Sequence, residues 1–196
     1  MTKKKSTEIR KNQIKKAVLE IISNEGIHSL STRNLAKKVG FSEAAVFRHF
    51  KTKRDILLSI MNDVKSDLML KLKDITSSDL SAKEKLFQFL CNHVRYLIKN
   101  KGITILLFSE AAHLNDSQLK QDLREILELQ KKLVSRIIRE GIKNGKWNST
   151  TKPEVFSTIY MGVPITLNIE LILNPDKLKL NNFCKKMFYL LLKTLK

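Results

Sequence analysis

The hydrophobic residues of the chain recur with the spacing of α-helices. In the first such segment, the i, i+3, i+4, i+7 and i+8 positions of one helical face are occupied by Ile14, Ala17, Val18, Ile21 and Ile22. The segment is followed by Asn-Glu-Gly, in which Gly26 can adopt the left-handed conformation that often ends a helix. The pattern therefore predicts a first helix that ends at Gly26.

Two short helices are predicted next. Ser31 is a suitable N-cap for a helix that runs to Val39, and Gly40 ends it. Ser42 is a second N-cap, and it precedes a helix over Glu43–Phe50. The chain thus has two short helices joined by a turn that contains a glycine, with a longer helix before them.

Longer helices fill the rest of the chain. Thr52 with Asp55, and Ser81 with Glu84, have the spacing of capping boxes and mark two helix starts. The first of these begins a linking helix over about residues 53–75. Later apolar patterns predict helices over about 103–114, 116–144, 153–173 and 176–195. No segment has the alternation of a strand, so we expect an all-α fold of about nine helices.

The domain organisation follows from these segments. Residues 1–55 form the short-helix unit, and residues 56–196 form a larger helical domain. The linking helix, about residues 53–75, connects the two. A polar stretch, Asp-Ile-Thr-Ser-Ser-Asp, begins at Asp74 near the end of the linking helix and precedes the helix that Ser81 begins. A domain boundary could also fall in this stretch.

The charge is strongly positive and unevenly distributed. The 196 residues carry a formal net charge of +18, and residues 1–55 hold 14 Lys and Arg against 5 Asp and Glu, a net of +9. A basic protein is attracted to polyanions, so this balance favours nucleic acid or an anionic membrane surface as the partner.

Several classes of function lack a matching pattern. The two cysteines, Cys91 and Cys184, stand far apart in apolar contexts and suggest neither a disulfide framework nor a metal pair. We expect no metal, no cofactor and no catalytic residue, because no nucleophile–base pair, metal-ligand spacing or glycine-rich phosphate loop occurs. The N-terminus lacks an apolar signal core, and the apolar run from Val155 is interrupted by polar residues. We therefore expect a cytoplasmic protein.

The two short helices have the form of a helix-turn-helix, whose second helix can enter the major groove of DNA. In the second helix, Val46 and Phe50 share one face and should pack inward. The segment GIHSLSTRNLAKKVGFSEAAVFRHFKTKRDILLSI resembles the DNA-binding module of TetR-family transcriptional regulators, and the resemblance spans roughly residues 8–65.

The resemblance implies which residues contact DNA. By position they are Ser31, Thr32, Arg33, Ser42, Glu43, Ala44, Ala45, Phe47, Arg48, His49 and Lys53. Many members have Thr where Ala45 stands and Tyr where Phe47 stands, so two hydroxyl contacts are missing here. Phe47 can still touch a thymine methyl group, and Arg48 can bind phosphate or guanine.

The resemblance implies that the remaining residues form a homodimer and bind a small molecule. An excess of apolar residues in the last two helices predicts a dimer interface that includes Phe183, Met187, Leu190 and Leu191. Apolar side chains of the middle helices, together with a proline that interrupts one of them, are candidates for a ligand pocket: Phe87, Cys91, Val94, Phe108, Phe156, Tyr160, Pro164 and Leu167. The resemblance implies a repressor that leaves a palindromic DNA operator when a mostly apolar effector binds.

Two other classes of function also fit the composition. A DNA-binding protein of the nucleoid type, without sequence preference, would explain the charge and the helix-turn-helix. A basic helical protein on a membrane surface would explain the charge and the apolar C-terminus, but not the caps or the turn at Gly40.

Overall fold

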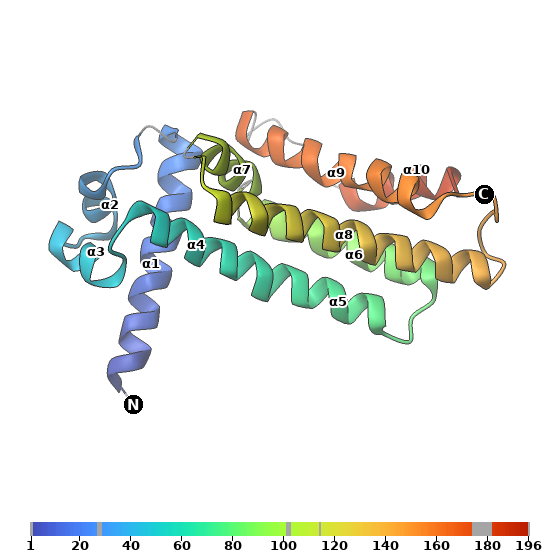
Figure 1. Ribbon diagram of the computed structural model, residues 1–196, viewed down its shortest axis with the longest axis horizontal. Coiled ribbons are helices and arrows are strands. Elements are labelled where there is room, and N and C mark those ends of the chain that lie inside the picture. Colours follow the sequence, from blue (N-terminus) through green and yellow to red (C-terminus); the bar gives the residue numbers. More distant parts are fainter. Residues whose placement is uncertain (1, 27–28, 101–102, 114, 174–181, 196) are drawn as a thin grey trace. The chain divides into compact units, whose positions relative to one another are not determined.

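The computed structural model describes residues 2–26, 29–100, 103–113, 115–173 and 182–195 (Figure 1). The described residues contain helices and no strands. There are nine such helices if the helical run from Lys53 to Ser77 is counted as one. The all-α prediction is confirmed. Two compact units divide between Asp63 and Val64, within the segment predicted as the linking helix.

The first unit, Met1–Asp63, contains α1 (Thr2–Glu25), α2 (Thr32–Val39), α3 (Glu43–His49) and α4 (Lys53–Asp63). The predicted inward face of α1 is buried at four of its five positions, and Ile22 is half-buried. α1 packs against both α2 and α3. At its end, Gly26 has a φ of 81°, the left-handed conformation that the sequence predicted.

One long-range contact of this unit was not predicted. The buried Lys15 on α1 forms an ion pair with Asp63 at the end of α4, with 2.7 Å between Nζ and Oδ2. An amine this deeply buried needs a charged partner. The pair therefore fixes the last turn of α4 against the middle of α1.

The second unit, Val64–Lys196, is a bundle of helices. The chain passes from α4 through a π-helix, η2 (Val64–Met69), into α5 (Leu70–Ser77). The remaining helices are α6 (Ala82–Lys99), α7 (Ile103–His113), α8 (Ser117–Lys143), α9 (Pro153–Leu173) and α10 (Phe183–Lys193).

These helices pack largely side by side. α8 contacts α5, α6, α7 and α9, and α10 packs against α6 (Figure 1). The cap predictions hold here too, because Ser81 and Glu84 form both bonds of a capping box at the start of α6. The predicted start of the last helix, near residue 176, lies outside the described residues, and α10 is described from Phe183.

Candidate DNA-binding surface and ligand cavity

Both helices of the helix-turn-helix begin with a serine cap, and a glycine forms the turn between them. Ser31 accepts a hydrogen bond from the Asn34 N–H at 3.1 Å, and Ser42 accepts one from the Ala45 N–H at 3.1 Å. Between the helices, Gly40 has a φ of 69°, and its N–H bonds to carbonyls of the last turn of α2. A side chain at this φ would be strained, so glycine allows the sharp change of direction.

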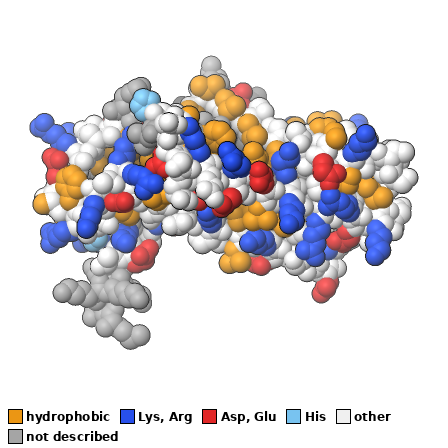
Figure 2. All heavy atoms as spheres, viewed as in Figure 1, with side chains coloured by type: hydrophobic (Ala, Val, Ile, Leu, Met, Phe, Trp, Pro, Cys, Tyr) orange, Lys and Arg blue, Asp and Glu red, His pale blue; other side chains and the backbone are white. Residues whose placement is uncertain are grey.

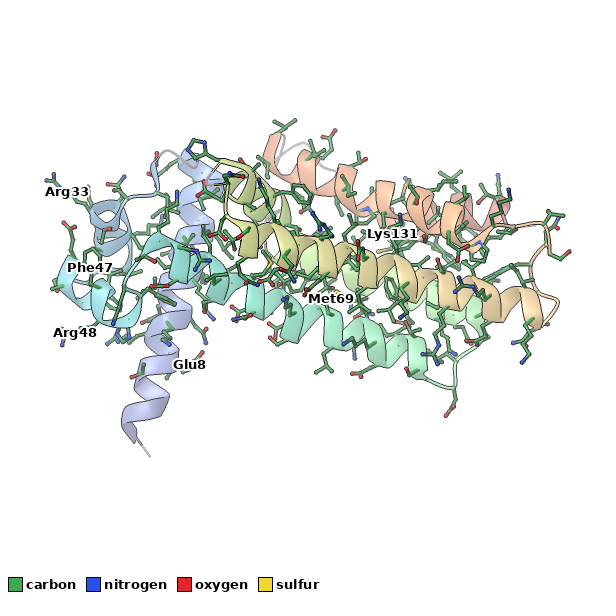
Figure 3. The ribbon with its side chains drawn as sticks, in the orientation of Figure 1. Glu8, Arg33, Phe47, Arg48, Met69 and Lys131 are labelled. Carbon is green, nitrogen blue, oxygen red and sulfur yellow. The ribbon has the colours of Figure 1, made fainter. Side chains whose placement is uncertain are left out.

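The short helix α3 presents one apolar face and one open face. Val46 is buried, as is Phe50, which ends the helix as its C-cap. On the other side, Phe47 is 48% exposed, although burying an aromatic ring is normally favourable. Figure 3 shows Arg48 on α3 and Arg33 on α2 at the outer edge of this unit, with Phe47 between the two helices.

The other predicted DNA contacts fall into three groups. Glu43 and Ala44 on α3 are exposed, whereas Ala45 and His49 are half-buried. Ser31, Thr32, Phe47 and Lys53 line a single depression of about 40 Å³, so α2, α3 and the start of α4 bring them together. The last group is Ser42, which lies at the α3 N-cap.

Two basic residues of α1 contact aromatic rings near the start and at the end of α3. The Arg10 guanidinium lies 4.8 Å from the centroid of the Phe41 ring, and Lys11 Nζ lies 5.6 Å from that of Phe50. Both distances allow cation–π attraction. Lys and Arg side chains are also prominent on the face of this unit that Figure 2 shows. The unit therefore combines a protruding helix with a positive surface.

The second unit contains an apolar cavity of about 200 Å³ among α6, α7, α8 and α9. Its apolar lining consists of Phe108, Leu123, Ile126, Leu127, Met161, Pro164 and Ile165. Four polar side chains complete it: His93, Thr104, Gln130 and Asn168. Among the described residues that line it there is no Lys, Arg, Asp or Glu.

The polar residues of the cavity are deeply buried. His93, Gln130 and Asn168 are only 3%, 4% and 5% exposed. Asn168 Nδ2 donates a hydrogen bond to Thr104 Oγ1 at 2.8 Å, which ties α9 to α7. Burial lowers the pKa of His93 to about 4, because the interior disfavours the charged imidazolium. At neutral pH the polar part of the cavity wall, which includes His93 and Asn168, is therefore uncharged.

The predicted pocket residues are only partly in this cavity. Phe108 and Pro164 line it, whereas Val94, Phe156, Tyr160 and Leu167 are buried in the core. His93, Gln130 and Asn168 line the cavity but were not predicted from the sequence. The signal that could have identified them is a polar residue at a position where the helical period demands an apolar one.

Phe87 and Cys91 lie near α10 instead. Phe87 stacks edge-on against Phe188 at 5.0 Å and lines an outer groove of about 480 Å³. Cys91 interacts with Cys184, and burial followed by this contact raises the pKa of Cys91 to about 12. The packing of α6 on α10 thus brings together two cysteines that stand far apart in the sequence, and both are free thiols.

Comparison with known proteins identifies the two units. Residues 14–60 match the bacterial regulatory proteins of the tetR family, and residues 60–194 match the C-terminal region of YsiA-like proteins. Together these matches cover the helix-turn-helix and nearly all of the second unit. The chain belongs to the TetR family of transcriptional regulators.

Individual TetR-family relatives extend the comparison. A fatty acid metabolism regulator protein of Bacillus subtilis is 28% identical over 134 residues, which are 68% of this chain and 69% of the relative. The nucleoid occlusion factor SlmA of Vibrio cholerae is 27% identical over 139 residues, or 70% and 71% of the two chains. The crystal structure of FadR from Bacillus subtilis in complex with stearoyl-CoA has the same fold, with a TM-score of 0.70, 24% identity and coverage of 94% and 98%.

Membership in the TetR family confirms the resemblance seen in the sequence. Proteins of this family are DNA-binding regulators that respond to small molecules, and neither matching profile describes an enzyme. α9 is long and apolar enough to cross a membrane by length and composition alone. However, this helix packs on α6, α7 and α8, as a helix of the second unit.

α9 also carries an exposed apolar stripe, which we define as Val155, Ile159, Gly162, Thr166, Ile169 and Leu173. The spacing of four and three residues places them along one side of the helix. Apart from the adjoining residues and the backbone of α9 itself, no atom of the described residues lies within 4 Å of the position that a Cβ on Gly162 would take. This side of the helix is therefore open to the described part of the chain.

On α10, the residues predicted for the dimer interface differ in exposure. Leu190 is exposed, Phe183 and Met187 are half-buried, and Leu191 is buried within its own unit. Tyr189, which was not predicted, is exposed beside Leu190. Leu190 and Tyr189 thus supply the large exposed apolar surface of α10.

Proposed function

We propose that the protein is a ligand-responsive repressor that binds a palindromic DNA operator as a homodimer. A small, mostly apolar effector releases it from DNA. The observation that carries the proposal is the cavity, because it gives a TetR-family chain a mostly apolar site for such a molecule. A protein with this role works where the chromosome is, so we place it in the cytoplasm, without a membrane partner.

The proposed DNA contacts divide by chemistry. Phe47 and Arg48 of α3 are placed against base edges, with Glu43, Ala44, Ala45 and His49 around them. Ser31, Thr32, Arg33, Ser42 and Lys53 are assigned to phosphates. The hydroxyl groups of Ser31 and Ser42 already accept cap bonds, and each can still donate its own hydrogen to a phosphate oxygen.

The proposed homodimer uses the exposed stripe of α9 with Leu190 and Tyr189 of α10. A two-fold operator needs two recognition helices about one DNA turn apart, roughly 34–36 Å, and only a dimer can supply them. The stripe runs along about five helical turns, and Thr166 is its one polar member. Gly162 at its centre would let two copies of α9 approach closely where they cross.

The effector is proposed to be mostly apolar because of the cavity lining. The names of two relatives agree with this class, since one is a fatty acid metabolism regulator and the other is a regulator in complex with stearoyl-CoA. In the proposed switch, the helical run from Lys53 to Ser77 carries the response, because its sequence begins in the first unit and ends in the second.

Selection of bound duplexes from random DNA tests the proposal. We expect the full-length protein to enrich one two-fold symmetric sequence, as a symmetric dimer requires. Retention of DNA without enrichment would favour the second candidate function, a nucleoid-type binder without sequence preference. The formal net charge of +18 is the observation that favours this alternative, because it attracts DNA of any sequence.

A further inference from the structure

The polar part of the cavity has unused hydrogen-bonding capacity. Among the described residues, neither His93 Nδ1 nor Asn168 Oδ1 has a hydrogen-bond partner, although both atoms are fully buried. Native proteins pair nearly all such atoms with protein, water or ligand. Both side chains line the same cavity, so a small rotation of each would bring its unpaired atom to a single bound molecule.

The electrostatics of the cavity exclude a charged ligand group. None of its described lining residues is a Lys or Arg, and His93 is neutral at pH 7 because burial lowers its pKa. A carboxylate or phosphate buried there would have no cation to balance it, which is strongly unfavourable. The group that meets His93 and Asn168 must therefore be polar and uncharged.

The volume limits the size of the ligand. An engineered protein cavity of about 150 Å³ binds benzene. The cavity here is somewhat larger, at about 200 Å³. It therefore has room for roughly eight to ten non-hydrogen atoms, which is one ring with a short substituent or a short chain.

We infer that the cavity takes an uncharged, mostly apolar molecule of this size whose hydroxyl group hydrogen bonds with His93 and Asn168. A hydroxyl group suits both residues because it donates one hydrogen and accepts at two lone pairs. It can thus pair with either tautomer of the imidazole and either orientation of the amide. This inference rests on the proposed function, in that it treats the cavity as the effector site.

Phenol and toluene provide the test, because they have the same shape and the same number of non-hydrogen atoms. Calorimetric titration of the full-length protein at pH 7 should show phenol binding about tenfold more tightly than toluene, because the two buried hydrogen bonds exceed the lost hydration of the hydroxyl group by a small net gain. Benzoate, which carries a charge, should not bind. Asn168→Leu and His93→Phe should each reduce the preference for phenol to about twofold or less.

Tyr160→Phe is the matched control. It also removes a buried hydroxyl that has no hydrogen-bond partner among the described residues, but Tyr160 does not line the cavity. This variant should keep the full preference for phenol. Equal binding of phenol and toluene to the wild type would overturn the inference, as would no binding of either or a full preference in both cavity variants.

These titrations contain no DNA, so they separate the inference from the proposed function. If phenol binds with the expected preference but operator DNA is not released, the ligand chemistry stands and the regulatory role fails. If toluene binds better than phenol and releases the operator, the regulatory role stands and the inferred chemistry is wrong.

Discussion

His93 shows how one buried residue links ligand chemistry to stability. The pKa of its imidazole is about 4 in the folded protein, against an ordinary value of 6.5, because burial opposes the charged form. Folding therefore keeps His93 neutral at a pH where the unfolded chain binds a proton. The contribution to stability is fully present above pH 6.5 and is lost as the pH falls toward 4.

We predict that this residue alone lowers the free energy of unfolding by about 3 kcal/mol between pH 7 and pH 4. Urea unfolding of wild type and His93→Gln over this range isolates the effect from that of the carboxylates. The wild type should lose about 3 kcal/mol more than the variant. If the free energy of unfolding fell equally with pH in the two proteins, His93 would not titrate in this way.

The DNA contacts of single residues should separate into two kinds. Lys53→Ala should weaken binding to operator and random DNA alike and lower the salt dependence of binding by about one ion, as the loss of a phosphate contact does.

Arg48→Ala should instead relax the preference at one base position by about 1–3 kcal/mol, if Arg48 reads a base edge. Equal losses on all sequences would assign Arg48 to the DNA backbone.

Sequence and structure agree best where a residue acts on its near neighbours. The cap at Ser31, the capping box of Ser81 and Glu84, and the left-handed Gly26 were all predicted, because each depends on residues within about one helical turn. The partner of Asn168 could not be predicted. It lies 64 residues away on another helix, and only packing brings the two together.

At the scale of elements, α9 has two apolar sides with different partners. One side is buried against neighbouring helices of the unit, and the other is the exposed stripe. The sequence predicted an excess of apolar surface in the last two helices. It could not tell which residues the unit itself buries, so Leu191 was assigned to the interface although it is buried within the chain.

We predict that Ile159→Glu breaks the dimer, because it places a charge in the middle of the apolar stripe. Ile159 is 52% exposed, so the folding of the monomer should change little. Leu70→Glu is the control, since Leu70 on α5 is 59% exposed and lies outside the stripe. Light scattering should find a monomer for the first variant and a dimer for the second; a dimer for both would place the interface elsewhere.

The π-helix η2 stands at the division between the units, and it is tied to the wall of the cavity. Lys65 Nζ lies 2.8 Å from Oδ1 of Asp122 on α8, and the next residue, Leu123, lines the cavity. π-helical segments are rare and often occur at functional sites. This ion pair is therefore a candidate route by which a ligand could move the linking helix.

We predict that Lys65→Met reduces the release of DNA by the effector but leaves the affinity for each partner nearly unchanged. The control is Lys85→Met, which removes a similar part-buried pair in which Lys85 Nζ lies 2.8 Å from Glu140 Oε2. That variant should lose stability and keep the response. Fluorescence anisotropy of labelled operator DNA measures how much DNA each variant releases when effector is added. Full release of DNA by Lys65→Met would show that the Lys65–Asp122 ion pair does not carry the coupling.

At the scale of the whole molecule, the central claim is that a ligand in the second unit controls DNA binding by the first. A ligand shifts this equilibrium only through its different affinity for the two states, so the coupling must be reciprocal. A release of about 100-fold corresponds to about 2.7 kcal/mol of coupling free energy.

The most direct measurement is the affinity of the effector with and without saturating operator DNA. We predict that operator DNA weakens effector binding by about 100-fold, the same factor by which the effector weakens operator binding. An effector affinity that is identical in the presence and absence of operator DNA would contradict the claim that the two sites are coupled.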